Sequence, residues 1–375
     1  MPARPVRTAA RRRSAAVRRA ARRCTSSTGT QPKTRVRTTT RRPLRGSRRH
    51  GGDTVAAGDL VTRPGHIQYG PLLLGPGTPY RWKTLSGWGD LPGLDSGTVA
   101  RSDAHGSFPG RLLAQARTVT VEGLMIRAPR GSIGAAVGAL EAGTVPVEDE
   151  LPLVVWLDER GPLLAYARAT RRLIPTGPGY RVGSIQEAAV EWEATDPRRY
   201  ELVERSDSAR LPMPEQGLDW HTSAETGTDT GLDWHTGAGA DGGLAFGEPG
   251  RTGALSVMNA GSAATHPLIE FRGPVVRPSL TNLATGDVLE YDLPLAAGDV
   301  LTVDTRAGTV TLNETASRLS TATARSVPEQ TWTLAPGELV GGVLMPTTTP
   351  LIFRAAPGST DPAASVTLRW RSAYF

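Results

Sequence analysis

The sequence predicts a mainly β protein with one substantial helix, arranged as a β domain, a linker and a C-terminal β-sandwich. Its 375 residues include 43 glycines and 30 prolines, which are too many for a helical bundle and typical of a loop-rich β protein. Apolar and polar residues alternate along several segments, as half-buried strands require. From residue 254 onward, strand candidates recur at about 8–12-residue spacing, which is typical of a sandwich.

The first β domain contains four strand candidates. Two valines of one candidate lie on a single face, and in another Val190, Trp192 and Ala194 lie opposite two glutamates. Each such strand presents one apolar face to a core. A third candidate is wholly apolar and is expected to be covered on both faces. The candidates are residues 118–121, 153–157, 163–174 and 187–194.

A helix is predicted over residues 132–142. Ser132 can cap its N-terminus, and the apolar positions 133, 136, 137 and 140 follow the spacing of one helical face. Gly143 can stop the helix. We expect the apolar stripe to lie on the sheet of the first domain.

The C-terminal region has the clearest pattern of short strands. Residues 300–304 and 309–313 alternate and are joined by four residues, and Gly308 can supply the positive φ that such a turn needs. This pair is therefore predicted to form a hairpin. The eight strand candidates are residues 255–259, 268–272, 288–293, 300–304, 309–313, 330–334, 351–354 and 366–370.

A segment of low aliphatic content separates the two β regions. It is rich in Ser, Gly, Thr, Asp and Pro, which is typical of a linker. The hexapeptide GLDWHT occurs twice in it, at residues 217–222 and 231–236, and a slipped duplication in a tolerant segment explains the two copies. The chain thus divides into a leader (residues 1–54), a β domain (55–205), a linker (206–253) and a β-sandwich (254–375).

The leader dominates the charge of the chain. The net charge is +7, yet residues 1–50 hold 17 Lys and Arg and no Asp or Glu, so the rest of the chain carries a net charge of −10. One interpretation is a disordered basic arm that contacts nucleic acid or a membrane surface. A solvated tail without a role is the second. The candidate nucleic-acid contacts are Arg11, Arg12, Arg13, Arg18, Arg19, Arg22 and Arg23.

A third interpretation is that the leader is not translated. Codons for residues 51–54 can contain a purine-rich ribosome-binding sequence at a suitable distance before a GTG codon for Val55. We therefore expect the mature chain to begin at or near Val55.

Composition excludes several classes of protein. Cys24 is the only cysteine, which excludes a disulfide framework and a zinc site built from cysteines. No apolar run approaches the roughly 18 residues of a membrane span. The leader also lacks the apolar segment of a secretory signal.

The motifs contain no catalytic constellation. Asp103, His105 and Ser107 are the residue types of a hydrolase triad, but triad members converge from separate segments, so a polar loop is favoured. The two Asp-Trp-His units could bind a metal, but a linker provides no surrounding groups to orient them. Glu148 and Glu150 lie in a loop and are interpreted as solvated charges. The sequence therefore predicts no enzyme, no cofactor and no metal site.

Two stretches resemble a known family. The first runs from PGHIQYG at residues 64–70 through GWGDLPGLDSGTVARSDAHGSFPGRLLAQARTVTVEG at residues 87–123. The second runs from NAGSAATHPLIEFRGP to GDVLTVDTRAGTVTLN within residues 259–313, followed by a Trp-bearing strand and the ending SVTLRWRSAYF. Both resemble the distal tail protein (Dit) of siphophages, of the kind found in phages and prophages of actinobacteria. The resemblance covers residues 60–375.

The resemblance implies a fold and a role. Family members have an N-terminal domain similar to a tail-tube protein, a β-sandwich or split barrel with one helix, and a galectin-like C-terminal β-sandwich. Six copies form a ring that joins the tail tube to the tail-tip or baseplate hub and lets DNA pass through without specific binding. The implied partners are other copies, the major tail tube protein, the hub protein, and a receptor-binding protein or cell-wall glycan. The implied location is the distal tip of the virion tail, after synthesis in the cytoplasm of the bacterial host, with a prophage as one source.

Two other functions stay open. The galectin-like resemblance suggests a carbohydrate-binding module for adsorption to the host cell wall, with Trp332 and Trp370 as candidate sugar contacts because exposed indoles stack on sugar rings. Trp in the core of a two-layer β fold is the competing interpretation. Nucleic-acid binding by the leader is the other alternative, and it would weaken steeply with salt.

Overall fold

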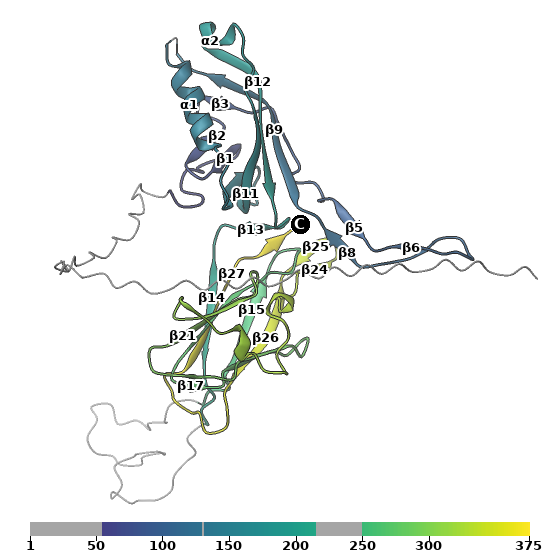
Figure 1. Cartoon of the computed structure of the whole chain (residues 1–375), viewed down its shortest axis with the longest axis vertical. Coiled ribbons are helices and arrows are strands. Elements are labelled where there is room, and N and C mark those ends of the chain that lie inside the picture. Colours follow the sequence, from purple (N-terminus) through teal and green to yellow (C-terminus); the bar gives the residue numbers. More distant parts are fainter. Residues whose placement is uncertain (1–54, 130, 215–249) are drawn as a thin grey trace, which may run out of the picture. The chain divides into compact units, whose positions relative to one another are not determined.

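The computed structural model describes residues 55–129, 131–214 and 250–375. Most elements in this part of the chain are strands, which confirms the predicted mainly β class. The helices in it are α1 (Ile133–Gly143) and the four-residue α2 (Gly179–Val182), and Figure 1 shows α1 beside the strands of the N-terminal domain. No helix of these residues has the length and apolar character needed to cross a membrane.

The N-terminal domain is built on a ten-stranded sheet. Its main path is β2-β1-β10-β11-β12-β9-β3, with β4 on β9, β13 on β11 and β28 on β13. Strand β11 connects the β2-β1-β10 side of the sheet to the β12-β9-β3 side, because its first part pairs with β10 and its second part with β12. The strands are β1 (His66–Tyr69), β2 (Leu72–Leu74), β3 (Tyr80–Arg81), β4 (Thr84–Ser86), β9 (Arg117–Arg127), β10 (Leu151–Trp156), β11 (Pro162–Leu173), β12 (Ser184–Ala194), β13 (Arg199–Glu201) and β28 (Ala373–Tyr374).

The alternation seen in the sequence places one face of these strands in a core. Val119 and Val121 of β9 and Val190 and Trp192 of β12 are fully buried, because successive side chains of a strand point to opposite faces. The Trp192 ring lies 5.7 Å from the ring of Tyr69, centroid to centroid. Both predicted strands are confirmed, and both are longer than the predicted segments.

Strand β10 is covered on both faces, as its apolar sequence predicts. Leu153 and Val155 face the main core of the domain. Val154 faces a second cluster that also contains Tyr200 and Ala373. This second cluster joins residues from the beginning of the described chain to residues near its end.

Helix α1 closes one end of the main core with the predicted apolar stripe. Its buried residues are Ile133, Ala136, Val137 and Leu140. The two ends of helix α1 differ from the prediction. The Ser132 hydroxyl donates to the carbonyl of Pro129 and does not cap the helix, and Gly143 is the last helical residue, with Thr144 as the C-cap.

A long hairpin connects β4 to β9. We call residues 91–114 the arm. Its two short ladders are formed by β5 (Leu94–Ser96) with β8 (Leu112–Ala114) and by β6 (Val99–Ala100) with β7 (Ser107–Phe108).

The C-terminal domain is a β-sandwich whose two main sheets enclose a separate core. The six-stranded sheet has the order β14 (Arg205–Arg210), β27 (Ser365–Trp370), β16 (Leu268–Arg272), β21 (Val300–Asp304), β22 (Thr309–Leu312) and β23 (Ala316–Ser317). The four-stranded sheet has the order β15 (Ala254–Asn259), β26 (Thr347–Arg354), β18 (Ser279–Asn282) and β19 (Val288–Glu290). Two small pairs are β17 (Val275–Val276) with β20 (Pro294–Leu295), and β24 (Glu338–Val340) with β25 (Val343–Met345).

Most predicted strands of the sandwich are present, including the hairpin around Gly308, whose φ is +68°. The strand predicted at residues 330–334 is wrong. Pro328 begins a short 3-10 helix, η2 (Glu329–Thr331), in which the amide of Thr331 donates to the Pro328 carbonyl, and only Leu334 makes a bridge, to Thr265. The other 3-10 helix is η1 (Leu319–Thr321).

The predicted linker begins later than its composition suggests. Residues 205–210 are Ser- and charge-rich, yet they form β14, which pairs along its whole length with β27. The backbone ladder needs no apolar side chains at the edge of a sheet, so a polar segment can serve as an edge strand.

Candidate assembly surfaces and the domain junction

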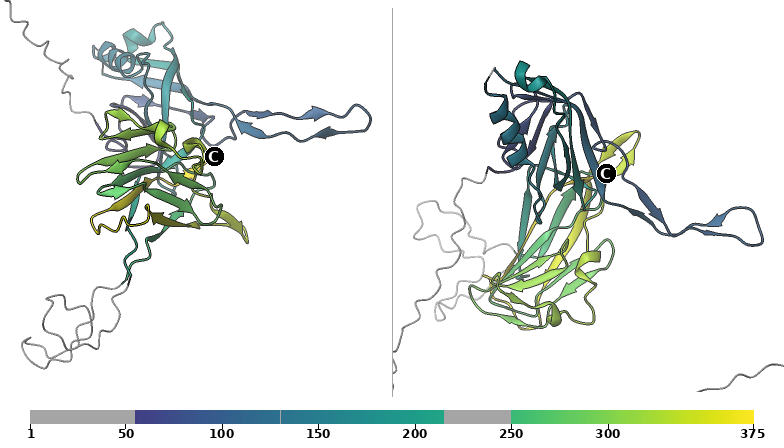
Figure 2. Two further views of the ribbon diagram at one scale, coloured as in Figure 1. Left: turned by 60° about the horizontal axis from the view of Figure 1, so that its bottom comes forward. Right: turned by 45° about the horizontal axis from the view of Figure 1, so that its top comes forward.

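The arm exposes large apolar side chains on a two-stranded ribbon. Figure 2 shows its two ladders as one continuous hairpin, and neither ladder pairs with a third strand among the described residues. The exposed fractions of its large apolar residues lie between 41 % and 67 %. These residues are Leu91, Leu94, Val99, Phe108, Leu112 and Leu113.

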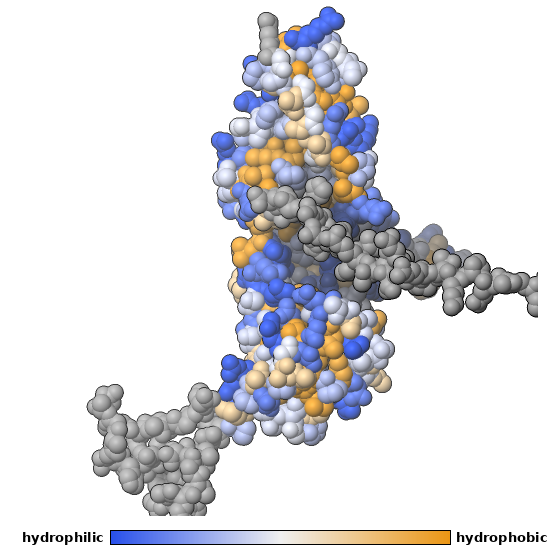
Figure 3. Space-filling view, turned by 60° about the vertical axis from the view of Figure 1, so that its left-hand side comes forward, coloured by the Kyte–Doolittle hydropathy of each residue, from blue (hydrophilic) through white to orange (hydrophobic). Residues whose placement is uncertain are grey.

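This concentration distinguishes the arm from an ordinary surface. On the face of the molecule in Figure 3, apolar and polar residues are interspersed, and scattered exposed hydrophobic residues are usual for a soluble protein. Six such residues within one hairpin, together with open strand edges, indicate a surface that contacts another protein.

Two glycines let the strands of the arm approach closely between the ladders. A Cβ on Gly110 would lie only 2.1 Å from the carbonyl oxygen of Gly97. Beyond this point Arg101 lies over the ring of Phe108, with the guanidinium carbon 4.7 Å from the ring centroid. The arm is therefore narrow at its middle and carries a cation–π pair near its tip.

A buried arginine holds the root of the arm. Nη1 of Arg117 donates to the carbonyls of Gly87 (2.7 Å), Trp88 (3.1 Å) and Asp90 (2.7 Å), and its Nε donates to the carbonyl of Pro197 (2.7 Å). Burial lowers the pKa of the Arg117 guanidinium, and the charge of Asp90 opposes that effect. Because one side chain binds both the segment before the arm and the loop before β13, it sets where the arm leaves the domain.

A second exposed hairpin belongs to the C-terminal sandwich. Strands β24 and β25 are joined by Gly341 and Gly342, which have φ values of +59° and +83°, as a tight two-residue hairpin turn requires. Four of its large apolar residues are between 49 % and 71 % exposed. They are Leu339, Val340, Val343 and Met345.

The two domains meet at a cluster of charged and polar residues, which we call the junction. At its centre the Asp196 carboxylate accepts hydrogen bonds from Nε of Arg198 (2.8 Å) and from the hydroxyl of Tyr200 (2.6 Å). Burial by itself raises the pKa of Asp196, but Arg198, Tyr200 and Arg306 outweigh it, so this pKa lies below its ordinary value of 3.8. The junction consists of Glu150, Tyr166, Asp196, Arg198, Tyr200, His266 and Arg306.

Arg306 brings the C-terminal sandwich into this cluster. Its guanidinium lies 3.6 Å from a carboxylate oxygen of Glu150, 3.4 Å from one of Asp196, and 5.4 Å from the ring centroid of Tyr166. From the N-terminal domain, Nη1 of Arg198 donates to the carbonyl of Ala264 in the C-terminal domain (3.0 Å). Each domain therefore contributes an arginine to groups of the other.

Strand β28 adds a backbone connection between the domains. It follows the last strand of the sandwich but pairs with β13 of the N-terminal sheet, Arg199 opposite Tyr374 and Tyr200 opposite Ala373. The Arg199 guanidinium donates to a main-chain oxygen of Phe375. Burial, with the nearby charges of Arg117 and Arg160, lowers the pKa of Arg199 to about 10.

His266 is expected to make stability depend on pH. Burial lowers its pKa from 6.5 to about 4, the charges of Arg198 and Arg306 act in the same direction, and those of Asp196 and Asp304 oppose it. The unfolded chain therefore takes up this proton near pH 6.5 and the folded chain only near pH 4, so the free energy of unfolding falls as the pH is lowered through this window. We expect His266 to contribute on the order of 2–3 kcal/mol to that fall.

Urea unfolding between pH 7 and pH 4 measures this contribution. The variant His266→Gln cannot take up the proton, so the difference in stability between the native chain and the variant should shrink as the pH falls. A difference that stays constant from pH 7 to pH 4 would contradict the assignment.

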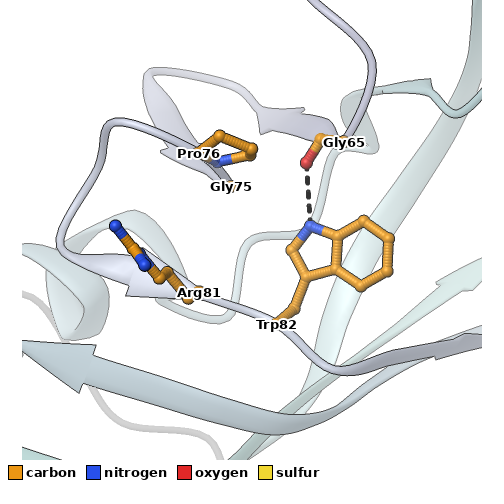
Figure 4. A pocket seen from close by; sticks show the side chains of 5 residues that line it. All are labelled: Gly65, Gly75, Pro76, Arg81 and Trp82. Atoms are coloured by element: carbon orange, nitrogen blue, oxygen red, sulfur yellow. Dashed lines mark hydrogen bonds between the residues drawn. The ribbon is translucent and has the colours of Figure 1, made fainter.

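A cavity of about 330 Å³ opens beside the turn after β2. Gly65, Gly75, Pro76, Arg81 and Trp82 line it, and Figure 4 shows the Trp82 indole along one side, with its Nε1 donating to the carbonyl of Gly65 (2.9 Å). Because the indole nitrogen is already bound, the side chain acts as a wall of the cavity.

The sequence-predicted site residues are not brought together. Trp332 is fully buried, and Trp370 is 6 % exposed and donates its Nε1 hydrogen to the carbonyl of Met258 (2.9 Å). Neither indole has the open face that stacking on a sugar requires, so glycan binding stays a prediction without these contacts. Asp103, His105 and Ser107 are exposed in and beside the tip of the arm. The leader arginines and both Asp-Trp-His units lie outside the described residues.

Glu150 lies in a loop, as predicted, but it is not the solvated charge that the sequence suggests. Its carboxylate accepts hydrogen bonds from the amide and the hydroxyl of Thr195 (2.9 and 2.7 Å) in addition to the contact with Arg306. No local pattern marks this residue, because its partners are distant in the sequence. The arm was also missed, although its exposed apolar residues flank the polar stretch around His105 and could have indicated a hairpin.

Comparisons with known proteins match this architecture. Residues 260–350 match the family described as the siphovirus-type tail component, C-terminal domain. The crystal structure of the Dit protein of phage SPP1, described as a paradigm of the hub adsorption apparatus in phages that infect Gram-positive bacteria, has a TM-score of 0.53 and 11 % identity, over 83 % of this chain and 99 % of that chain. A chain of the phage p2 baseplate in its activated conformation has a TM-score of 0.38 and 12 % identity, over 78 % and 97 % of the two chains. No curated protein matches the sequence.

The family match and the fold confirm the resemblance to siphophage distal tail proteins. An origin in an actinobacterial phage or prophage stays a prediction.

Proposed function

We propose that this chain forms a homohexameric ring at the distal end of a siphophage tail, where it joins the tail tube to the tail-tip or baseplate hub. The match of residues 260–350 to the siphovirus tail-component domain carries the proposal. The two-domain fold, which spans nearly the whole SPP1 Dit chain, supports it. In this role the chain is structural and has no catalytic activity.

The proposed partners follow from this position. They are further copies of the chain, the major tail tube protein, the hub protein and a receptor-binding protein. DNA passes through the lumen without specific binding. The chain is made in the cytoplasm of the bacterial host and is then incorporated at the distal tip of the tail.

The arm supplies a physical reason for self-association. Open strand edges and clustered apolar side chains favour association with another chain. A closed ring of identical copies covers such a surface on every copy and leaves no unpaired end. The exposed residues around Phe108 and Leu112 are therefore proposed to contact the neighbouring copy.

Measuring the mass of the assembly tests both the ring and the arm. We expect the full chain to elute as a hexamer in light-scattering chromatography and to form rings in negative-stain microscopy. The double variant Phe108→Asp with Leu112→Asp should raise the dissociation constant by at least about a hundredfold, because burying unpaired charges costs several kcal/mol.

The matched control is Val182→Asp, which places a charge at another exposed apolar position, in α2, and should keep the hexamer. A native chain that stays monomeric at high concentration would overturn the ring. A hexamer that tolerates the double variant would remove the arm from the contact.

A further inference from the structure

We propose that the β24–β25 hairpin of one copy receives the arm of the neighbouring copy. This inference rests on the proposed ring and names the second surface that the ring contact uses. A ring needs such a surface, because head-to-tail association joins two different patches of the same chain.

The β24–β25 hairpin has the features expected of that second patch. Its exposed apolar residues fall within eight consecutive positions, 338–345, whereas exposed hydrophobic residues elsewhere on the described sandwich, such as Val276 and Leu319, are dispersed. Strand β24 pairs with β25 and with no other described strand, so each strand offers one open edge. The glycine turn makes the tip narrow and leaves its main chain accessible.

The roots of the arm and of the β24–β25 hairpin lie at the same pair of strands. At the root of the arm, Arg117 binds the carbonyl of Pro197, just before β13. At the root of the hairpin, the amide of Gly337 donates to the carbonyl of Gly261 (2.7 Å). Gly261 lies so close to β28 that a Cβ there would be 1.8 Å from the carbonyl oxygen of Ala373. Both elements therefore start beside the β13–β28 pair.

This common origin matters in a ring. Cyclic symmetry places equivalent features of all copies at the same height along the axis. An arm that leaves one copy at the level of its β13–β28 pair and extends in the plane of the ring reaches the next copy at the level of that copy's β24–β25 hairpin. The dozen residues between Leu91 and Asp103, of which β5 and β6 are strand, would span roughly 40 Å if fully extended, about the width of a domain of this size, so the arm is long enough to reach.

The chemistry of the two surfaces is complementary. Ten apolar side chains, each between 41 % and 71 % exposed, together present on the order of 1,000 Å² of apolar surface, which is about the minimum area expected of a biological interface. At the rims, the arm carries the exposed Arg101 and Arg111 beside Asp95 and Asp103, and the hairpin carries Glu338 as its charged residue. An arginine of the arm opposite Glu338 would give the contact one favourable charge pair.

Cross-linking between two marked copies tests this contact directly. Both variants are full chains in which Cys24 is replaced by serine. One carries Phe108→Cys and the other Val343→Cys, with different affinity tags, and the two are produced together. After treatment with a short bismaleimide, we expect a cross-linked species that carries both tags. Replacing Val343→Cys by Val276→Cys should lower its yield at least tenfold; Val276 lies in the same domain and is 49 % exposed, against 61 % for Val343.

A second measurement introduces charges into the β24–β25 hairpin instead of a cross-link. Leu339→Asp with Val343→Asp should raise the dissociation constant of the ring to a similar extent as the double variant of the arm. A ring that forms without the cross-link, or that tolerates these two charges, overturns the arm–hairpin contact and leaves the proposed ring standing. A native chain that stays monomeric overturns both.

Discussion

Replacing Arg117 with alanine is expected to lower the free energy of unfolding by about 3–5 kcal/mol. The guanidinium donates to four carbonyl groups, from Gly87, Trp88, Asp90 and Pro197, and the side chain is 1 % exposed. Its loss leaves a cavity and several buried carbonyls without a donor. It also releases the root of the arm, so we expect trypsin to cleave the arm at Arg101 or Arg111 faster than in the native chain.

Chemical unfolding and limited proteolysis measure these two effects. Arg127→Ala is the matched control, because Arg127 lies at the other end of the same strand and is exposed; a change within about 0.5 kcal/mol is expected there. The loss of unfolding free energy for Arg117→Lys should lie between the losses for Arg117→Ala and Arg127→Ala, since a single ammonium group cannot reproduce the forked geometry of a guanidinium. A loss below about 1 kcal/mol for Arg117→Ala would show that Arg117 does not anchor the arm.

Replacing Trp332 with alanine is expected to cost about 3–5 kcal/mol, the usual range for a large aromatic residue of a core. Trp332 is fully buried among the residues of the sandwich core. Its Nε1 hydrogen has no hydrogen-bond partner among the described residues. The indole thus contributes packing and brings with it the cost of an unpaired donor.

Trp332→Phe separates these two contributions. The phenyl ring keeps most of the packing and removes the unpaired donor, so the loss should stay below about 1.5 kcal/mol. Thermal and urea unfolding of both variants check the expectation. Equal losses for phenylalanine and alanine would mean that the shape of the indole, and not burial of an aromatic ring, stabilises the sandwich.

Patterns that repeat along the chain predicted much of this fold. Alternation identified strands β9, β11 and β12 and most of the sandwich, because burial of one face fixes which residues of a strand are apolar. The spacing of Ile133, Ala136, Val137 and Leu140 identified α1 in the same way. These signals are local, so a short window of sequence contains them.

Two errors in the predicted strands have different physical causes. Trp332 and Leu334 do alternate with Thr333, and both are buried, but a 3-10 turn after Pro328 places them in the core without a strand. Conversely, the polar residues of β14 form a strand because β27 offers a free edge. In the first case a nearby turn after Pro328 replaces the expected strand, and in the second a distant strand supplies pairing that the local pattern does not indicate.

The assembly surfaces and the junction were the least predictable features. Glu150, Asp196 and Arg306 are separated by long stretches of sequence and meet only in the folded chain. The arm consists of short strands between glycines, and its apolar residues have no core to face, so neither period nor burial distinguishes it from a loop. Its one local signal is that apolar residues flank the polar stretch around His105. The family resemblance predicted a ring without indicating which residues form its contacts.

The pairing of β28 with β13 links the completion of the fold to the timing of synthesis. Glu201 and Tyr374, which are joined by a hydrogen bond, are 173 positions apart in the chain. At roughly 5–20 residues per second, a ribosome needs on the order of ten seconds or more to make the intervening segment. During that time β13 lacks its partner strand β28. The β13–β28 pair, beside which the arm and the β24–β25 hairpin begin, is therefore not yet formed. A nascent chain therefore completes the β13–β28 pair only after its C-terminal sandwich has been made.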